Sequence, residues 1–175
     1  MSTLKVNKII PTAGVPTGGG GGIVQIKQAF KGDTFTTTSG SFVDVTGLSV
    51  SITPTSTSSK ILVKVNVCGQ GRPSYARNLP RLVRDSTPIG NSTDAGSRIA
   101  AFGQMYQGED GNNVATNSIE FLDSPATTSS VTYKVQIVNG NGTGDVMCIN
   151  RSYDDGASSS GHRYSSSITV MEVSA

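Results

Sequence analysis

The stretch from Ser41 to Val67 constrains the fold most, because its hydrophobic residues recur at every second position. Its second half places Ile61, Val63, Val65 and Val67 on one face of an extended segment, and Leu62, Lys64 and Asn66 on the other. A period of two is that of a β-strand with one buried face and one solvent face. The first half alternates in the same way around Val50 and Ile52 and stops at Pro54, which has no amide hydrogen to donate. Two such strands need a second apolar layer over them, and we expect the rest of the chain to supply it.

Similar short runs recur along the chain and predict strands at 23–30, 42–45, 48–53, 60–68, 81–84, 118–122, 131–137, 146–150 and 164–173. The Thr-rich segment 34–41 is a candidate edge strand, and 98–102 is a further candidate. Between residues 45 and 48, Thr46-Gly47 permits a bulge or corner. Segments 69–78, 104–117 and 151–162 read as long loops.

No stretch shows a helical period, so the sequence predicts an all-β chain of about eight to ten strands. Many short strands with Gly and Pro turns are typical of a sandwich, a jelly roll or a barrel. Among these we predict an antiparallel, jelly-roll-like sandwich with a short N-terminal extension. The order of the strands does not follow from the pattern.

Residues 1–22 differ from the predicted β-domain at 23–175. A short apolar set is interleaved with polar residues and is followed by two prolines and the glycine run Gly18–Gly22, which cannot hold a strand or helix cheaply. One interpretation is a frayed terminus. We favour an attachment peptide on a flexible hinge, docking on a partner or a neighbouring subunit through Leu4, Val6, Ile9 and Ile10.

Composition excludes several classes of protein. The chain has 175 residues, a formal charge of +2, two cysteines and no tryptophan. We therefore expect no nucleic-acid partner and no membrane insertion, although five arginines gather in the middle of the chain: Arg72, Arg77, Arg81, Arg84 and Arg98. A basic patch, a subunit interface and a solvated face remain open for them. Cys68 and Cys148 end apolar runs, where a free thiol acts as a small buried hydrophobe, and one disulfide between them is the alternative.

Residues suited to catalysis or metal binding do not form a convincing centre. His162, the single histidine, lies in a Ser- and Gly-rich loop beside Asp154 and Asp155. The carboxylate pairs Glu109/Asp110 and Glu120/Asp123 are weak candidates for glycoside hydrolysis. Asp110-Gly111-Asn112-Asn113 offers oxygen ligands without the spacing of a calcium loop. The sequence therefore predicts no enzyme, no cofactor and no metal site.

The long loops instead carry Tyr with Arg, Asn and Asp, a composition suited to sugar or protein surfaces. It suits an ordinary exposed loop equally well. The candidate surface-binding residues are Arg72, Tyr75, Arg77, Tyr106, Asn112, Tyr153, Asp154, Asp155 and Arg163.

Three stretches resemble structural proteins of tailed bacteriophages, especially phages of marine cyanobacteria: STLKVNKI, FVDVTGLSVSITPTSTSSKILV, and IEFLDSPATTSSVTYKVQ with the later INRS and SSITVMEV. The resemblance is to tail-fibre or virion appendage proteins and covers most of the chain. It implies that the N-terminal peptide tethers the protein to the particle, that residues 1–17 contact other virion proteins, and that the β-domain is a homotrimer. The repetitive shaft of a long fibre is missing, so the resemblance implies a short knob.

Together these inferences predict a non-enzymatic virion protein, assembled in the host cytoplasm, whose oligomeric β-domain binds host surface polysaccharide. The alternatives are a capsid decoration or cement protein and a glycan-degrading enzyme.

Overall fold

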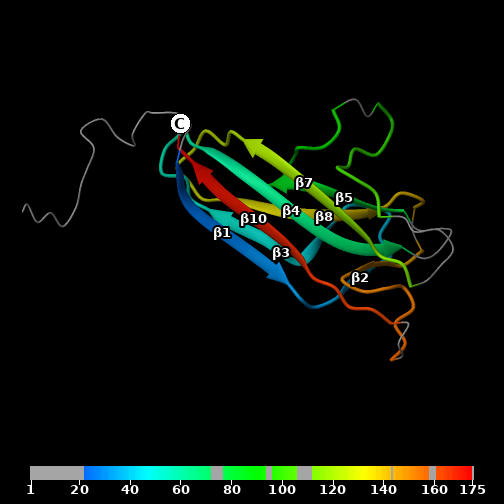
Figure 1. Cartoon of the computed structure of the whole chain (residues 1–175). Helices are drawn as coiled ribbons and strands as arrows, with labels where there is room; N and C mark the ends of the chain where they lie inside the picture. The colour runs from blue at the N-terminus through cyan, green and yellow to red at the C-terminus, as the bar shows by residue number, and fades with distance from the viewer. Residues whose placement is uncertain are drawn as a thin grey trace, which may run out of the picture.

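A computed structural model of the chain describes residues 22–71, 77–93, 96–105, 112–142, 144–157 and 161–174. Within these residues the secondary structure is entirely β, as predicted (Figure 1). The strands are β1 (Ile23–Lys31), β2 (Phe35–Thr37), β3 (Val43–Ile52), β4 (Lys60–Gly71), β5 (Asn78–Arg84), β6 (Thr87–Ile89), β7 (Ala115–Asp123), β8 (Val131–Asn139), β9 (Met147–Ile149) and β10 (Ser166–Val173). The attachment residues Leu4, Val6, Ile9 and Ile10 lie outside the described residues.

The strands pair as one long antiparallel hairpin. The first pairs with the last, the second with the second-last, and so on inward: β1 with β10, β2 with β9, β3 with β8, β4 with β7 and β5 with β6. This hairpin is rolled up, because β10 also pairs with β4 and β8 also pairs with β5. The result is a first sheet in the order β1-β10-β4-β7, extended by β9 and β2, and a second sheet in the order β3-β8-β5-β6. Nested pairing rolled into two sheets is the arrangement of a jelly roll, so the predicted fold class is confirmed.

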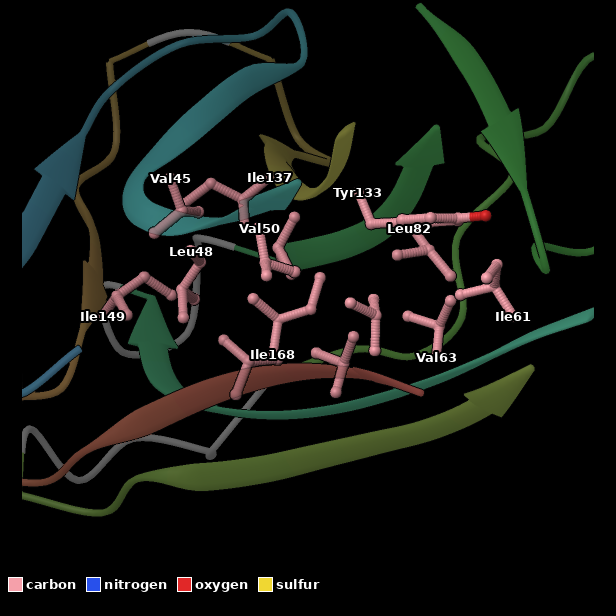
Figure 2. Close-up of a cluster of buried hydrophobic side chains, with 14 of the residues drawn as sticks. Val45, Leu48, Val50, Ile61, Val63, Leu82, Tyr133, Ile137, Ile149 and Ile168 are labelled. Atoms are coloured by element: carbon pink, nitrogen blue, oxygen red, sulfur yellow. The ribbon is translucent and has the colours of Figure 1, made fainter. Parts of the chain in front are cut away.

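Alternate residues of both sheets meet in one core. In β4 the predicted inward residues Ile61, Val63, Val65 and Val67 are all buried. In Figure 2 the two layers contact through Ile61, Val63 and Ile168 from the first sheet and Val50, Leu82 and Tyr133 from the second. The two halves of the 41–67 stretch differ from our expectation in one respect. We expected both strands to lie in one layer covered by the rest of the chain. Instead β3 lies in the second sheet and β4 in the first, and the two strands face each other across the core.

The end of β4 was predicted wrongly because Gly69 was taken to end the strand. We expected a strand at 60–68 and a loop from Gly69, but β4 continues to Gly71 and pairs there with β9. A side chain at Gly69 would place its Cβ 2.6 Å from the carbonyl oxygen of Cys148. This glycine therefore permits close approach of a neighbouring strand and does not end one.

Other strand predictions were partly wrong. The candidate strand at 98–102 does not form; instead Phe102 and Met105 donate backbone hydrogen bonds to Pro80 and Asn78 along β5. The short strand β6 was missed because Pro88 lies within it. The candidate edge strand 34–41 shrinks to β2. The predicted irregularity at Gly47 is confirmed, since the register shifts between Asp44 and Ser49 and Gly47 has a φ of 87°.

The two ends of the sandwich differ. At one end, which we call the entry end, Gly22 leads into β1, and its carbonyl accepts a hydrogen bond from Ser174 (Figure 1). The opposite end, which we call the loop end, gathers the connections 140–146 and 150–165 and the segment 32–42, which contains β2. Strands of nine residues separate the two ends by about 30 Å. Among the described residues, no helix is long and apolar enough to cross a membrane.

Candidate functional site

The loop end contains every described member of the candidate surface-binding set. These are Arg77, Asn112, Tyr153, Asp154, Asp155 and Arg163, whereas Arg72, Tyr75 and Tyr106 lie outside the described residues. All but Arg77 belong to, or approach, the segment 150–165 that joins β9 to β10. Arg77 lies beside the 140–146 connection, where its carbonyl accepts a hydrogen bond from Gly140 at 2.8 Å.

A buried polar base holds segment 150–165 in place. Asn150 is fully buried and has a φ of 62°. Its amide nitrogen donates to the carbonyls of Lys31 and Asp33 at 2.8 and 3.0 Å, and its amide oxygen accepts from the Ser166 hydroxyl at 2.6 Å. These bonds tie the segment to the end of β1 and the start of β10. A buried side chain with all of these partners fixes the backbone where the segment leaves β9 and where it enters β10.

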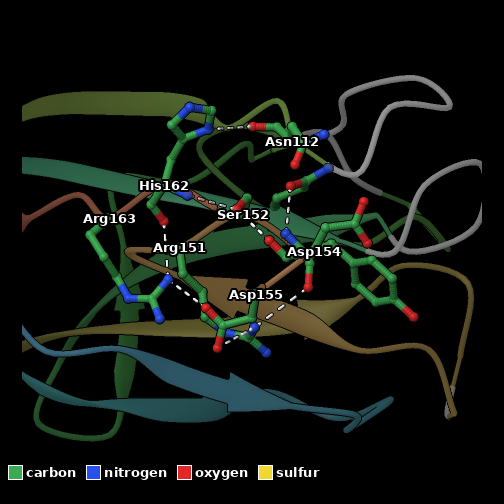
Figure 3. A network of polar contacts seen from close by, with 9 residues as sticks. Asn112, Arg151, Ser152, Asp154, Asp155, His162 and Arg163 are labelled. Carbon is green, nitrogen blue, oxygen red and sulfur yellow. Dashed lines mark hydrogen bonds and ion pairs between the residues drawn. The ribbon is translucent and has the colours of Figure 1, made fainter. Parts of the chain in front are cut away.

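Above this base, a carboxylate clamps the two arms of the loop (Figure 3). Asp155 forms ion pairs with Arg151, at 2.9 Å, and with Arg163. The buried Ser152 donates to the carbonyl of Asp154 at 2.9 Å and accepts from the backbone amide of His162 at 3.1 Å. The Arg163 side chain is 56% exposed, so its guanidinium group can contact a ligand while it stays paired with Asp155. The arrangement presents fixed hydrogen-bonding groups on an exposed surface.

His162 does not form a catalytic triad with its neighbouring aspartates. Its Nδ1 lies 3.4 Å from the carbonyl of Asn112, and its ring packs 6.3 Å from the ring of Tyr164. The carboxylate of Asp155 is occupied by the two arginines, and Asp154 contributes its backbone carbonyl. The histidine therefore links the 112 loop to segment 150–165.

The suspected carboxylate pair Glu120/Asp123 is split between two faces of β7. Glu120 is exposed and forms an ion pair with Lys64 at 2.7 Å. Asp123 is buried; Arg84 donates to both of its oxygens at 2.7 and 2.8 Å, and the Tyr133 hydroxyl donates at 2.6 Å. Burial, and then the adjacent carboxylate, raise the pKa of Tyr133 well above its ordinary value. This buried network joins the two sheets.

The other suspected carboxylates, Glu109 and Asp110, lie outside the described residues. In the part of the chain that the structure describes, no group of three or more His, Cys, Asp and Glu side chains is placed to hold a metal ion.

Two of the mid-chain arginines have structural partners. Arg81 stacks 3.6 Å from the centre of the Phe42 ring and donates to Gln136 at 2.9 Å. Arg84 is bound to Asp123. Two of the five guanidinium groups thus hold sheet residues together. Cys68 and Cys148 are buried and not joined, as expected of small hydrophobes, and burial raises the pKa of the Cys148 thiol.

The sequence prediction missed a shallow hollow on the outer face of the first sheet. Its volume is about 470 Å³, and its polar lining is already paired across strands. Gln28 donates to Thr169 at 2.8 Å, and Ser118 donates to Asn66 at 3.1 Å. The polar residues that line the hollow occupy solvent-facing positions of alternating strands, and such positions are visible in the sequence. Which of them become neighbours depends on the strand order.

No protein-family model matches this chain, and no curated protein matches it. A solved structure, described as that of infectious bursal disease virus Gx strain, is similar with a TM-score of 0.41 and 11% sequence identity. The match covers 86% of this chain and 37% of that viral chain, so this chain spans just over a third of its length. The jelly-roll assignment rests on the nested strand pairing described above.

Proposed function

We propose that this chain is a non-enzymatic structural component of a bacteriophage virion, a short knob that is attached by its N-terminal peptide and presents its loop end outward. The observation that carries the proposal is the polarity of the sandwich. The residues that precede Gly22 leave at the entry end, and segment 150–165 lies at the opposite end. An attachment through residues 1–17 would therefore tether the entry end and leave the loop end free to face away from the particle.

Two further features support this function. Jelly rolls recur in viral capsid and lectin domains, so the fold suits both assembly and sugar binding. The loop end carries rigidly held polar groups, including Asp155 and Arg163, on an exposed surface. Preorganised groups of this kind bind a hydroxyl-rich ligand with little loss of conformational entropy. Host surface polysaccharide is the ligand class that we propose.

The attachment is tested by deleting residues 1–17. The truncated chain should still fold and unfold cooperatively, since the residues of the hydrophobic core lie within 29–170. It should be missing from purified particles when supplied in place of the full chain. A matched control, Arg163→Ala in the full chain, should enter particles normally. Normal incorporation of the truncated chain would refute the attachment role.

The display role is tested with host polysaccharide and purified protein. Tyr153→Ala and Arg163→Ala should each weaken binding, measured by surface plasmon resonance, without changing the melting temperature by more than a few degrees. If the loops serve particle stability instead, as in a decoration protein, these variants will bind normally and the particles that carry them will lose heat resistance. Shortening of the polysaccharide during incubation would establish the enzymatic alternative.

A further inference from the structure

A row of apolar side chains crosses the outer face of the first sheet at a single register. Ile26 lies opposite Met171, Met171 opposite Leu62, and Leu62 opposite Leu122. We call these four residues the outer apolar row. Ile26 is 56% exposed and Leu122 is 53% exposed. The next outward-facing row, two residues closer to the loop end in each strand, is polar: Gln28, Thr169, Lys64 and Glu120. An apolar row that spans four strands on a solvent face marks an interaction surface.

The row reaches the edge of the sheet at β1. This strand pairs with β10 on one side and with no other described strand on its other side. It runs for nine residues without a proline, and it exposes Phe30 (67%) as well as Ile26 on its outer face. A long edge strand with exposed apolar side chains is a template for an added strand.

The attachment peptide has the pattern that this edge requires. Val6, Lys8 and Ile10 repeat, at every second position, the apolar-polar-apolar order of Ile26, Gln28 and Phe30. A strand formed by residues 4–10 could thus place apolar residues beside Ile26 and Phe30 and a polar residue beside Gln28. Added in that register, it would lengthen the outer apolar row by one strand.

The linker between the peptide and β1 is long enough to reach another molecule. Residues 11–22 include the glycine run and would span about 20 Å on average as a flexible chain. Fully extended, twelve residues span about 40 Å. Because the linker joins the head at the entry end, where β1 starts, the peptide of one copy can reach the β1 edge of an adjacent copy.

We propose that residues 4–10 of one copy add as a strand to the free edge of β1 in a second copy, continuing the outer apolar row across the subunit boundary. The inference goes beyond the proposed function, because it concerns a contact between copies of the chain and not a contact with the particle. A ring closes when each copy gives its peptide to the next.

The test compares full-length variants by size-exclusion chromatography with light scattering. The unaltered chain should elute as a multiple of its 18.1 kDa mass. A peptide variant, Val6→Lys with Ile10→Lys, and an edge variant, Ile26→Lys with Phe30→Lys, should each be monomeric. Each should raise the dissociation constant by at least about 100-fold, since both place charges within an apolar contact. Leu122→Lys is the matched control; three strands, β1, β10 and β4, lie between it and the added strand, so this variant should stay oligomeric.

Mixing the two monomeric variants provides the decisive result. The peptide variant keeps an intact β1 edge, and the edge variant keeps an intact peptide. The mixture should form a one-to-one complex in which the β1 amides of the peptide variant become protected from hydrogen exchange. A mixture that stays monomeric overturns the proposal. So does an unaltered chain that is monomeric, which would indicate pairing within one copy, or loss of assembly in Leu122→Lys, which would indicate packing of whole sheet faces.

These results are independent of the attachment test. If the peptide variant still assembles but is missing from particles, the strand exchange is wrong and the attachment role stands. If it is monomeric but enters particles normally, the attachment role is wrong and the peptide serves assembly alone.

Discussion

Replacing Glu172 by glutamine probes how the entry end of the sandwich is held together. This carboxylate is fully buried on β10. One oxygen accepts from the side-chain amide of Gln25 at 2.6 Å, and the other accepts from the backbone amide and the hydroxyl of Thr55 at 2.7 and 2.6 Å. The three bonds connect β1, β10 and the crossover that carries the chain from β3 to β4.

The magnitude follows from the pKa of the group. Burial by itself raises the pKa of Glu172, but hydrogen bonds from Gln25, Thr55 and Ser59 outweigh it and lower the pKa from 4.5 to about 2. A carboxyl group with a depressed pKa stabilises the fold above its unfolded-state pKa, and this contribution is lost as the pH falls through the folded-state value. The shift corresponds to about 3 kcal/mol at neutral pH. Glutamine retains one acceptor oxygen but turns an NH₂ group toward donors, so we expect Glu172→Gln to lose about 2–3 kcal/mol.

Urea unfolding at a series of pH values measures this contribution. At pH 7 the variant should be less stable than the unaltered chain by the amount above, and the difference should shrink between about pH 4.5 and pH 2. Glu120→Gln is the matched control, because its carboxylate is 62% exposed and its pair with Lys64 should contribute less than about 1 kcal/mol. A difference that is small at pH 7, or that does not change with pH, would refute the assigned role of Glu172.

Three further outcomes are expected. Tyr133→Phe should lower the free energy of unfolding by about 1–2 kcal/mol in a denaturant titration, because the buried carboxylate of Asp123 loses a 2.6 Å bond; an unchanged value would exclude a role for this network in joining the sheets. Asn150→Ala should cost about 2–3 kcal/mol and increase hydrogen exchange across 150–165, since it removes three bonds; exchange that stays slow would mean that another contact holds the segment. Cys148 should react with a thiol reagent only after unfolding, because it is buried and its pKa is raised; rapid reaction in the native state would contradict its burial.

The parts of the fold that sequence alone predicts are those set by local periodicity. The alternations in 61–67 and 131–137 identify inward residues correctly, because the side chains of a strand point to opposite faces. Pairing between strands is not local. The contact of Ile26 with Met171 joins residues from opposite ends of the chain, and no property of either segment specifies the other. The outer apolar row therefore becomes visible only when the strand order is known.

A glycine or a proline does not always mark the end of a strand. Gly47 marks an irregularity, as predicted, whereas Gly69 lies inside a strand because Cys148 approaches its backbone closely. Pro88 lies in β6, an edge strand, where its missing amide hydrogen costs no sheet bond.

The candidate site was likewise predictable from the sequence only in part. Loop composition placed Asp155 and Arg163 among the binding candidates, but the buried Asn150 that holds their loop carries no signal in its local sequence.

In the proposed assembly the entry end of the sandwich faces the particle and the loop end faces outward, and electron microscopy of labelled particles tests this arrangement directly. One label would be inserted at Ser58, in the exposed turn of the entry end, and another at Gly142, in the exposed turn of the loop end. The label at Gly142 should lie farther from the particle surface than the label at Ser58, by up to the length of the sandwich, about 30 Å. Labels at equal height, or the reverse order, would contradict it.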